Sequence, residues 1–492
     1  MRERMISILL SIVLLALLAS CKEVVFEEKK DVSNFLIRPK GEAVELCYTE
    51  NPEAGMTYRW YSYSDSEGTD PVLVFEGASY TTEAFTEPGI RHFRCQVFSS
   101  ETKVAESMMY HVFHTGLPVV SVDTTTGKDI TEKTNWVDAN ISIISGDETF
   151  EEAITIKGRG NSSWAENPKK GYNFKLPEKT KLLGMSKSKK WALIANYPDY
   201  TKLGNWYASY LGNEVFNHDP WQFSCEHVDL VVNGEYKGSY ILCERIGIES
   251  KRLDIPDIAK LDSSFEDLNG DGKVDLKDGG FVVEFTYVPS SMMFNTPHGA
   301  SASLKDPDLE EVEGSWSARA IYERIKTVIR EAEASMYGET NKPYSEYIDV
   351  ESFVDWYLLN EYAGNGEASF NTSTYAYFDP SDSKVHMGPI WDFDRTFFRG
   401  IQLSTGDESN IWFQALLKDP EFVQRLKNRW EEKRTVLLGS AVTDLISRNE
   451  HIAVSRNMDE LRWEQGHMDV ASMIDDWIPR KIAWMDEYLN SL

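Results

Sequence analysis

Hydrophobic and polar positions follow one period in the first part of the chain and another in the last. From about residue 35 to 115, apolar residues recur at every second position, as in 43–48 and 92–98, with turn residues between the runs. A further strand-rich stretch reaches about residue 300 and contains a hairpin, 227–244, that turns at Asn233-Gly234. From about residue 315 the spacing is helical. This order predicts an α+β fold.

Two details sharpen the helical part. The first predicted helix carries an apolar face, made of Ala318, Ile321, Ile325, Val328 and Ile329. Further along, Asp349 stands where it can cap the N-terminus of a second helix. That helix ends before a loop, and a strand is expected over 374–378.

The N-terminal strands contain a recognisable order of core residues. Cys47, Trp60 and Cys95 follow one another, and Phe93 lies two positions before the second cysteine. This order resembles an immunoglobulin-type sandwich, in which a disulfide between the sheets packs against a tryptophan. The resemblance implies an Ig-like module over residues 35–115 with a Cys47–Cys95 disulfide. Its expected role is a spacer, and a glycan- or protein-binding role is the alternative.

The first residues indicate export and lipid attachment. Arg2 and Arg4 precede an apolar run, 6–20, that is too short to span a bilayer comfortably. The run ends in Leu-Ala-Ser-Cys, which resembles a bacterial lipobox. We therefore expect a signal peptide over 1–20, lipidation of Cys21, a tether over 21–34 and attachment to the membrane by lipid alone. Lys22 after the cysteine favours a cell-envelope lipoprotein of the Gram-negative outer membrane.

Composition limits the classes of partner. The chain has 492 residues, with 51 Lys+Arg against 79 Asp+Glu and a formal net charge of −28. Hydrophobic residues make up 41%, which excludes a disordered acidic protein. The charge argues against nucleic acid as a partner, because a phosphate backbone is repelled. Cys225 and Cys243 stand near the open end of the hairpin, where a disulfide and two free thiols are both open.

One glycine-rich stretch stands out as a candidate anion site. Gly158 to Trp164 reads GRGNSSW, and it presents Arg159 and Asn161 on a tight turn. Lys170 and Lys175 follow in KKGYNFKL (169–176), so a dense basic cluster forms in an otherwise acidic protein. A phosphate-bearing substrate would need such a local cluster.

Two acidic stretches suggest a metal and a catalytic loop. Asp392 and Asp394 in GPIWDFD (388–394) follow a strand, and paired carboxylates suit a hard divalent cation such as Mg²⁺. The loop before that strand contains Glu367 and Asn371. A carboxylate with a nearby asparagine, then a strand and a metal-binding aspartate, is the layout of a kinase catalytic loop.

These motifs together resemble the CotH family of spore-coat-type atypical kinases, which also occur as bacterial surface lipoproteins. The matching stretches are GRGNSSW, KKGYNFKL, LLGM (182–185), KWALIANYPDYTKLGN (190–205), HVDLVVNGEYKGSYILCERI (227–246), GGFVVEF (279–285), NEYAGN (360–365) and GPIWDFD. The resemblance implies a divergent kinase-like domain over 117–492. It also implies binding of ATP with Mg²⁺ or Mn²⁺ and phosphorylation of a protein Ser, Thr or Tyr.

The resemblance assigns roles residue by residue. The nucleotide site would use Arg159, Asn161, Lys170 and Lys175, and either Glu244 or Glu284 would orient a lysine. Asp392 would bind metal, with Asp394 and Asn371 in support. Glu367 would be the catalytic base, at a place where family members usually carry the shorter aspartate.

A separate loop matches a calcium site. Its oxygen ligands recur with EF-hand spacing around Gly272, and they come from Asp267, Asn269, Asp271, Asp275 and Asp278, with the carbonyl of Lys273. We expect a structural Ca²⁺ in an insertion at about 262–280.

Two functions follow from these motifs. The first is a lipid-anchored, extracytoplasmic CotH-type kinase, favoured by the aspartate motif and the basic cluster. The alternative is a catalytically weak or inactive surface protein, a pseudokinase or scaffold that binds glycan or protein, favoured by Glu367 and the Ig-like module.

Overall fold

The structure is a computed structural model. It describes residues 34–218, 222–259, 279–290, 292–307, 316–366, 368–370, 372–401 and 410–492. The predicted signal peptide, lipidated Cys21, almost all of the tether and the predicted calcium ligands lie outside the described residues. Among the helices that are described, none combines the length and the apolar character needed to cross a membrane.

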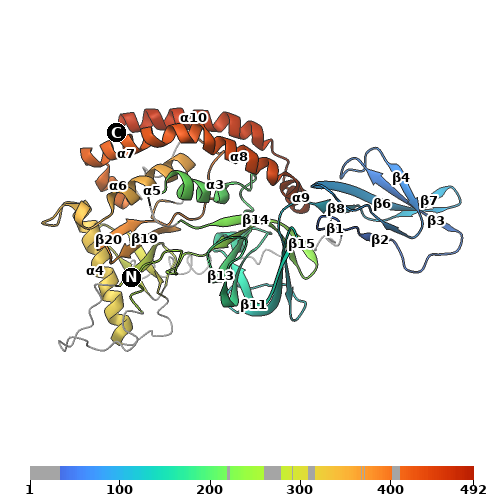
Figure 1. Cartoon of the computed structure of the whole chain (residues 1–492), viewed down its shortest axis with the longest axis horizontal. Coiled ribbons are helices and arrows are strands. Elements are labelled where there is room, and N and C mark those ends of the chain that lie inside the picture. Colours follow the sequence, from blue (N-terminus) through green and yellow to red (C-terminus); the bar gives the residue numbers. More distant parts are fainter. Residues whose placement is uncertain are drawn as a thin grey trace, which may run out of the picture. The chain divides into compact units, whose positions relative to one another are not determined.

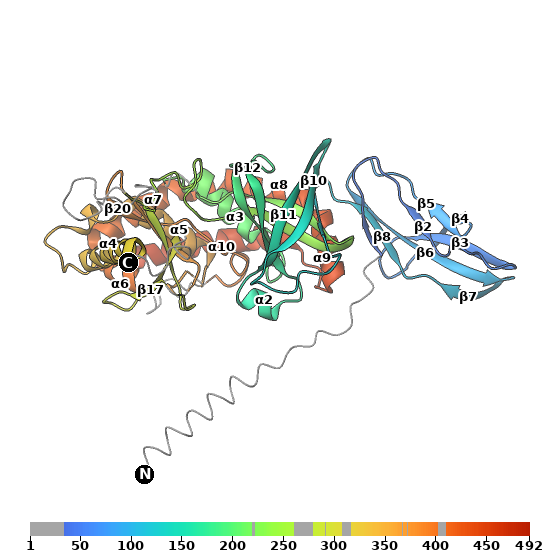
Figure 2. The same ribbon diagram turned by 90° about the horizontal axis from the view of Figure 1, so that it is seen from below.

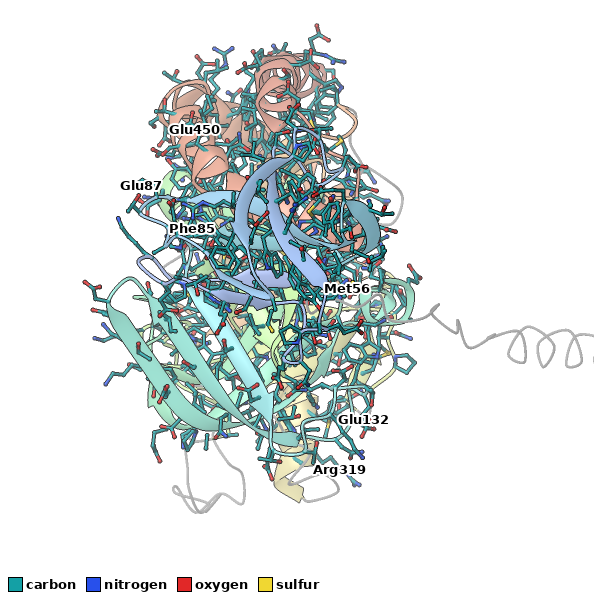
Figure 3. The ribbon with its side chains drawn as sticks, turned by 90° about the vertical axis from the view of Figure 1, so that its right-hand side faces the viewer. Met56, Phe85, Glu87, Glu132, Arg319 and Glu450 are labelled. Carbon is teal, nitrogen blue, oxygen red and sulfur yellow. The ribbon has the colours of Figure 1, made fainter. Side chains whose placement is uncertain are left out.

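The N-terminal strands form two sheets. The larger has the order β1-β8-β6-β3-β4 with β7 added to β6, and the smaller pairs β2 with β5. Their bounds are β1 Phe35–Ile37, β2 Glu45–Cys47, β3 Met56–Tyr63, β4 Val72–Glu76, β5 Ser79–Thr81, β6 Gly89–Ser99, β7 Thr102–Glu106 and β8 Tyr110–His114. The core between them centres on the fully buried Trp60; Figure 3 labels Phe85 and Met56 of this core. The Ig-like topology stays a prediction.

The structure contradicts the predicted Cys47–Cys95 disulfide, because both thiols are free. Cys95 is buried on β6 directly opposite Trp60, but Cys47 is exposed at the end of β2. On β2 it is Leu46, 2% exposed, that enters the core. Since side chains alternate between the faces of a strand, Cys47 must point outward. The order of the cysteines in the sequence is typical of the disulfide. However, the residue of β2 that faces the core is Leu46, one position before Cys47.

The next strands close into a seven-stranded sheet around a core of its own. The order is β10-β11-β12-β13-β15-β14-β9, and the parallel pair β9–β14 closes it. Figure 2 shows β10, β11 and β12 side by side. The bounds are β9 Val119–Thr124, β10 Val137–Ser145, β11 Glu148–Arg159, β12 Gly171–Thr180, β13 Ser188–Ile194, β14 Cys225–Val232 and β15 Glu235–Glu244. This sheet supplies one wall of the site described below.

The predicted hairpin is confirmed as β14–β15. Asn233 and Gly234 have φ angles of 49° and 75°, the left-handed conformation that a two-residue hairpin turn requires. At its open end Cys225 and Cys243 are directly opposed and buried, and both are free thiols.

A five-stranded sheet follows with the order β17-β18-β16-β19-β20. Its bounds are β16 Phe281–Phe285, β17 Met293–Asn295, β18 Ser301–Asp306, β19 Thr374–Asp379 and β20 Lys384–Met387. β19 confirms the strand expected over 374–378. β16 pairs directly with β19, so residues 284 and 375 become neighbours although β17, β18, α4, η3 and α5 lie between them in the sequence.

Helices make up most of the remaining chain, and α7, α8 and α10 pack side by side (Figure 1). The helical bounds are α2 Ser162–Glu166, α3 Gly204–Tyr210, η1 Leu211–Val215, α4 Trp316–Met336, η3 Tyr344–Glu346, α5 Val350–Ala363, α6 Ile411–Leu416, α7 Pro420–Leu438, α8 Ser440–His451, α9 Ala453–Trp463 and α10 Val470–Ser491. The apolar face predicted for α4 is confirmed, since all five of its residues are buried. Asp349 caps α5 as predicted, accepting a hydrogen bond from the Ser352 N–H at 2.8 Å. The α+β prediction holds.

Candidate functional site

A polar cavity of about 360 Å³ brings together motifs that lie far apart in the sequence. Its walls come from the end of β11 and the turn after it, the start of β12, the segment after β13 and the end of β15. The five-stranded sheet and the loop after β20 complete it. The charged residues that line it are Arg159, Lys169, Arg245, Glu284, Lys305, Asp392, Asp394 and Arg395. Cations thus surround a smaller group of carboxylates in a strongly acidic protein.

The glycine-rich turn forms one wall of the cavity. The turn is so tight that a side chain at either glycine would clash with its neighbours in the turn. A Cβ on Gly158 would lie 2.3 Å from the Trp164 ring, and one on Gly160 would lie 2.3 Å from Ser163 Oγ. Gly160 also has a φ of 113°, which L side chains rarely adopt. The tight turn brings Arg159 and Asn161 to the cavity, as the sequence predicts. The Arg159 guanidinium lies 5.4 Å from the centre of the Trp391 ring.

The two predicted lysines do not line the cavity. Lys170 Nζ donates to the carbonyl of Trp164 at 2.5 Å. Lys175 is exposed on β12, with its ammonium 4.4 Å from the Trp136 ring centre. In their place the structure puts Lys169, which sequence reasoning missed. Lys169 lies two residues before β12, outside the strand, so strand alternation gives no signal for it.

Lys169 is held by a buried counter-charge from α9. Its Nζ lies 2.5 Å from Oδ1 of Asp459, and Lys202 Nζ lies 2.9 Å from Oδ2 of the same carboxylate. All three side chains are 0–1% exposed. Burial lowers the pKa of Lys169 to about 8 against the opposing effect of Asp459. Burial alone would raise the pKa of Asp459, but the two ammonium groups hold it below its ordinary value.

The alternative between Glu244 and Glu284 is decided by position. Glu244 is fully buried outside the cavity, where it accepts hydrogen bonds from the Ser186 N–H at 2.8 Å and the Ser224 N–H at 3.1 Å. Glu284 lines the cavity and forms an ion pair with Lys305 of β18. Glu284 therefore holds a lysine at the site, and Glu244 stabilises loops. Lys305 belongs to no recognised motif, so no sequence pattern pointed to it.

Asp392 and Asp394 both face the cavity from the loop after β20. Asp392 adopts a left-handed conformation with a φ of 68°, and Ser373 Oγ donates to its Oδ2 at 3.2 Å. The residue between the two aspartates, Phe393, has its side chain fully buried. Alternate side chains therefore project from this loop toward the cavity.

Helix α3 fixes the backbone of that loop. The Phe393 N–H donates to Asn205 Oδ1 at 2.9 Å, and Asn205 Nδ2 donates to Asn196 Oδ1 at 2.8 Å. A Cβ on Gly204 would lie 2.3 Å from the Phe393 carbonyl oxygen, so only glycine allows this approach. The segment 196–205 thus positions the carboxylates, and its first residues, 196–198, also line the cavity.

Two further groups make the cavity attractive to anions. Arg159 and Arg245 both line the cavity, and burial, followed by the nearby Arg159, lowers the pKa of Arg245. Because arginine stays charged in proteins, their repulsion favours an anion between them. Tyr375 lies among the same charges, and burial followed by Glu284 raises its pKa.

The predicted catalytic base and one metal ligand are not placed. Glu367 and Asn371 lie outside the described residues. Thr372 and Ser373, which follow Asn371 in the sequence, line the cavity.

Comparison with known proteins agrees with this arrangement. Residues 156–486 match the protein family described as CotH kinase protein. The matched stretch is more than half of the chain and contains every described residue that carries charge into the cavity. A search of curated proteins finds no match to this chain. The chain belongs to the CotH kinase protein family.

Proposed function

We propose that this protein is a lipid-anchored, extracytoplasmic kinase that transfers the γ-phosphate of ATP to a Ser, Thr or Tyr of an acceptor protein. The observation that carries the proposal is the cavity itself. It gathers Asp392 and Asp394 with Arg159, Arg245 and Lys305 in a chain of net charge −28. A nucleotide triphosphate with a divalent cation needs this combination of oxygen ligands and cations.

The residues present fit a magnesium ion. Asp392 and Asp394 supply carboxylate oxygens, the ligands that hard cations prefer, and Ser373 adds a hydroxyl beside Asp392. Mn²⁺ would suit the same ligands. When bound, the ion would neutralise part of the charge of the phosphates.

The cationic side chains have separate tasks in this proposal. Arg159 and Arg245 bind phosphate oxygens, for which the planar guanidinium gives paired hydrogen bonds. Glu284 orients Lys305 toward the phosphates through their ion pair. A Cβ at Gly158 or Gly160 would meet Trp164 or Ser163, so glycine allows the tight turn that holds Arg159 and Asn161 at the cavity.

The remaining parts of the chain complete the proposal. Lipidation at Cys21 would hold the protein to the outer membrane, and a structural Ca²⁺ would fold the insertion at 262–280. Residues 35–115 would act as an Ig-like spacer; the two sheets and the Trp60-centred core support this topology. The partners are a nucleotide and a protein acceptor, and nucleic acid is not among them.

Nucleotide binding is tested by thermal unfolding of the full chain. Mg²⁺ with ATP should raise the melting temperature, because a ligand at 100 times its Kd stabilises by about 2.7 kcal/mol. EDTA should remove most of the shift, since the carboxylates then lack a bridging cation. AMP, which lacks the β- and γ-phosphates, should give a smaller shift. Equal melting temperatures with and without Mg²⁺ and ATP would count against the proposal.

Replacing Lys305 with methionine should weaken Mg²⁺–ATP binding at least about tenfold. A hydrogen bond to a charged group contributes about 1.5–3 kcal/mol, and every 1.4 kcal/mol changes Kd tenfold. Lys170→Met is the matched control and should change Kd less than threefold, because Lys170 bonds to Trp164 outside the cavity. Isothermal titration calorimetry measures both. If Lys170→Met is the more damaging change, the cavity is assigned to the wrong lysine.

A further inference from the structure

A second cluster of ionisable side chains lies outside the nucleotide cavity. It consists of His218 after η1, Asp349 at the N-terminus of α5, Asp382 in the turn between β19 and β20, and His386 on β20. None of the four lines the cavity. Three chain segments separated by up to 168 positions thus meet at one point.

The distances among these side chains suit a small metal ion. His218 Nε2 lies 2.9 Å from Asp349 Oδ1, and His386 Nδ1 lies 3.9 Å from the same oxygen. A tetrahedral ion with bonds of about 2.0–2.1 Å keeps its ligand atoms about 3.3 Å apart. The two observed distances, both measured to Asp349 Oδ1, lie on either side of that value, so small rotations of the two imidazoles bring each nitrogen to it.

The fourth residue has the place of an orienting partner. His386 Nε2 lies 3.0 Å from Asp382 Oδ2, on the other side of the ring from Asp349. A carboxylate at one ring nitrogen fixes the proton there and leaves the other nitrogen as a metal ligand. The Tyr377 ring stacks on His386 with centroids 4.7 Å apart, which limits rotation of the imidazole.

We propose that His218 Nε2, Asp349 and His386 Nδ1 bind one zinc ion, with Asp382 orienting His386. Two imidazoles and a carboxylate favour zinc over Mg²⁺ or Ca²⁺, which take oxygen ligands. Three protein ligands leave the fourth position to water.

The position of the ion gives it a structural task. Asp349 caps α5, which leads into the loop before β19, and His386 lies two residues before Gly388 and the segment that carries Asp392. His218 follows the helix pair that begins with α3, whose Asn205 holds Phe393. One ion would therefore tie together the three segments that support the catalytic carboxylates.

The test uses the full chain after EDTA treatment and dialysis, titrated with zinc chloride. We expect saturable stabilisation at one equivalent per chain, and a visible Co²⁺ spectrum of the intense, tetrahedral type when cobalt replaces zinc. His218→Ala and His386→Ala should abolish both signals. Asp382→Asn should weaken binding roughly 10- to 100-fold, as substitutions of orienting partners do. His218 is on the surface, so His218→Ala is expected to fold normally.

Two controls separate this site from others. His298 pairs with Glu339 at 3.1 Å, so His298→Ala removes a comparable histidine–carboxylate pair and should leave zinc binding unchanged. Asp392→Asn should also keep the zinc response. Zinc binding that survives in the His218→Ala/His386→Ala double variant, or that disappears in Asp392→Asn, would overturn the proposal, as would an octahedral Co²⁺ spectrum.

Discussion

Asp459→Asn is expected to lower the free energy of unfolding by about 3–5 kcal/mol, the usual cost of removing one partner from a buried ion pair. The substitution keeps the side-chain shape but leaves the ammonium groups of Lys169 and Lys202 without their shared counter-charge. The effect should be large because all three groups are shielded from water, so solvent cannot replace the lost charge. Urea denaturation of the two proteins gives the difference directly.

Asp476→Asn is the matched control. Asp476 pairs with Arg480 at 2.6 Å on α10, but both side chains are more than half exposed. A solvated pair of this kind contributes about 0.2–1 kcal/mol. If Asp459→Asn costs no more than Asp476→Asn, the buried pair does not stabilise the fold.

The pH dependence of Asp459→Asn adds a second check. In the folded protein burial already places the pKa of Lys169 at about 8, below its ordinary value of 10.5. The unfolded chain therefore binds more protons between these values, so stability rises with pH in this window. Without Asp459 the pKa of Lys169 falls further below 8, so the stability deficit should shrink as the pH is raised toward about 8 and stay constant above it. A deficit that grows with pH would contradict this assignment.

Asp392→Asn is expected to reduce ATP turnover by about a thousandfold or more. Charge stabilisation by a bound metal is worth several kcal/mol, and each 1.4 kcal/mol changes a rate tenfold. The amide keeps the shape and the Ser373 contact but loses the negative charge that would hold the proposed cation. Steady-state turnover at saturating Mg²⁺ and ATP measures the effect.

Asp379→Asn serves as the control for that substitution. Asp379 ends β19 in the same sheet, where its Oδ1 accepts from the Ser381 N–H at 2.8 Å, and it does not line the cavity. It should retain most of the wild-type turnover. The urea midpoints of both variants should lie near that of the wild type, so that a loss of activity reports on the metal site. Equal turnover by Asp392→Asn and Asp379→Asn would remove Asp392 from the mechanism.

Local patterns predict much of this fold because neighbouring residues decide them. The β14–β15 hairpin follows from Asn233-Gly234, the buried face of α4 from its apolar spacing, and the cap at Asp349 from a short polar side chain before a helix. These features need no knowledge of distant contacts. They were therefore readable from the sequence.

Features that depend on distant partners were not readable. The choice of Lys169 over Lys170 depends on Asp459, which lies 290 residues away. Lys305 reaches the site because β18 pairs with β16, and Glu284 meets Tyr375 because β16 pairs with β19. The failed disulfide shows the same limit at short range, because one residue of strand phase sends Cys47 outward.

The sequence motifs predicted the kinds of charged group at the site correctly, but they identified only some of the residues that line it. Arg159, Asn161, Asp392 and Asp394 were all assigned from motifs, and all four line one cavity. The residues of one motif are close in the sequence and lie on the same turn. They therefore stay close together in the folded protein. Arg245 stands inside the matching stretch 227–246, but that stretch alone did not single it out, and its place in the cavity came from the structure.

The most direct test of the proposed kinase activity is transfer of labelled phosphate. The full-length protein is incubated with Mg²⁺, ATP labelled at the γ-phosphate and a generic acceptor protein, and labelled Ser, Thr and Tyr are measured after acid hydrolysis. We expect label with the wild type, none in EDTA and almost none with Asp392→Asn. Equal labelling by the wild type and Asp392→Asn, or ATP binding without any labelled residue, would contradict the assignment and favour a scaffold that binds nucleotide.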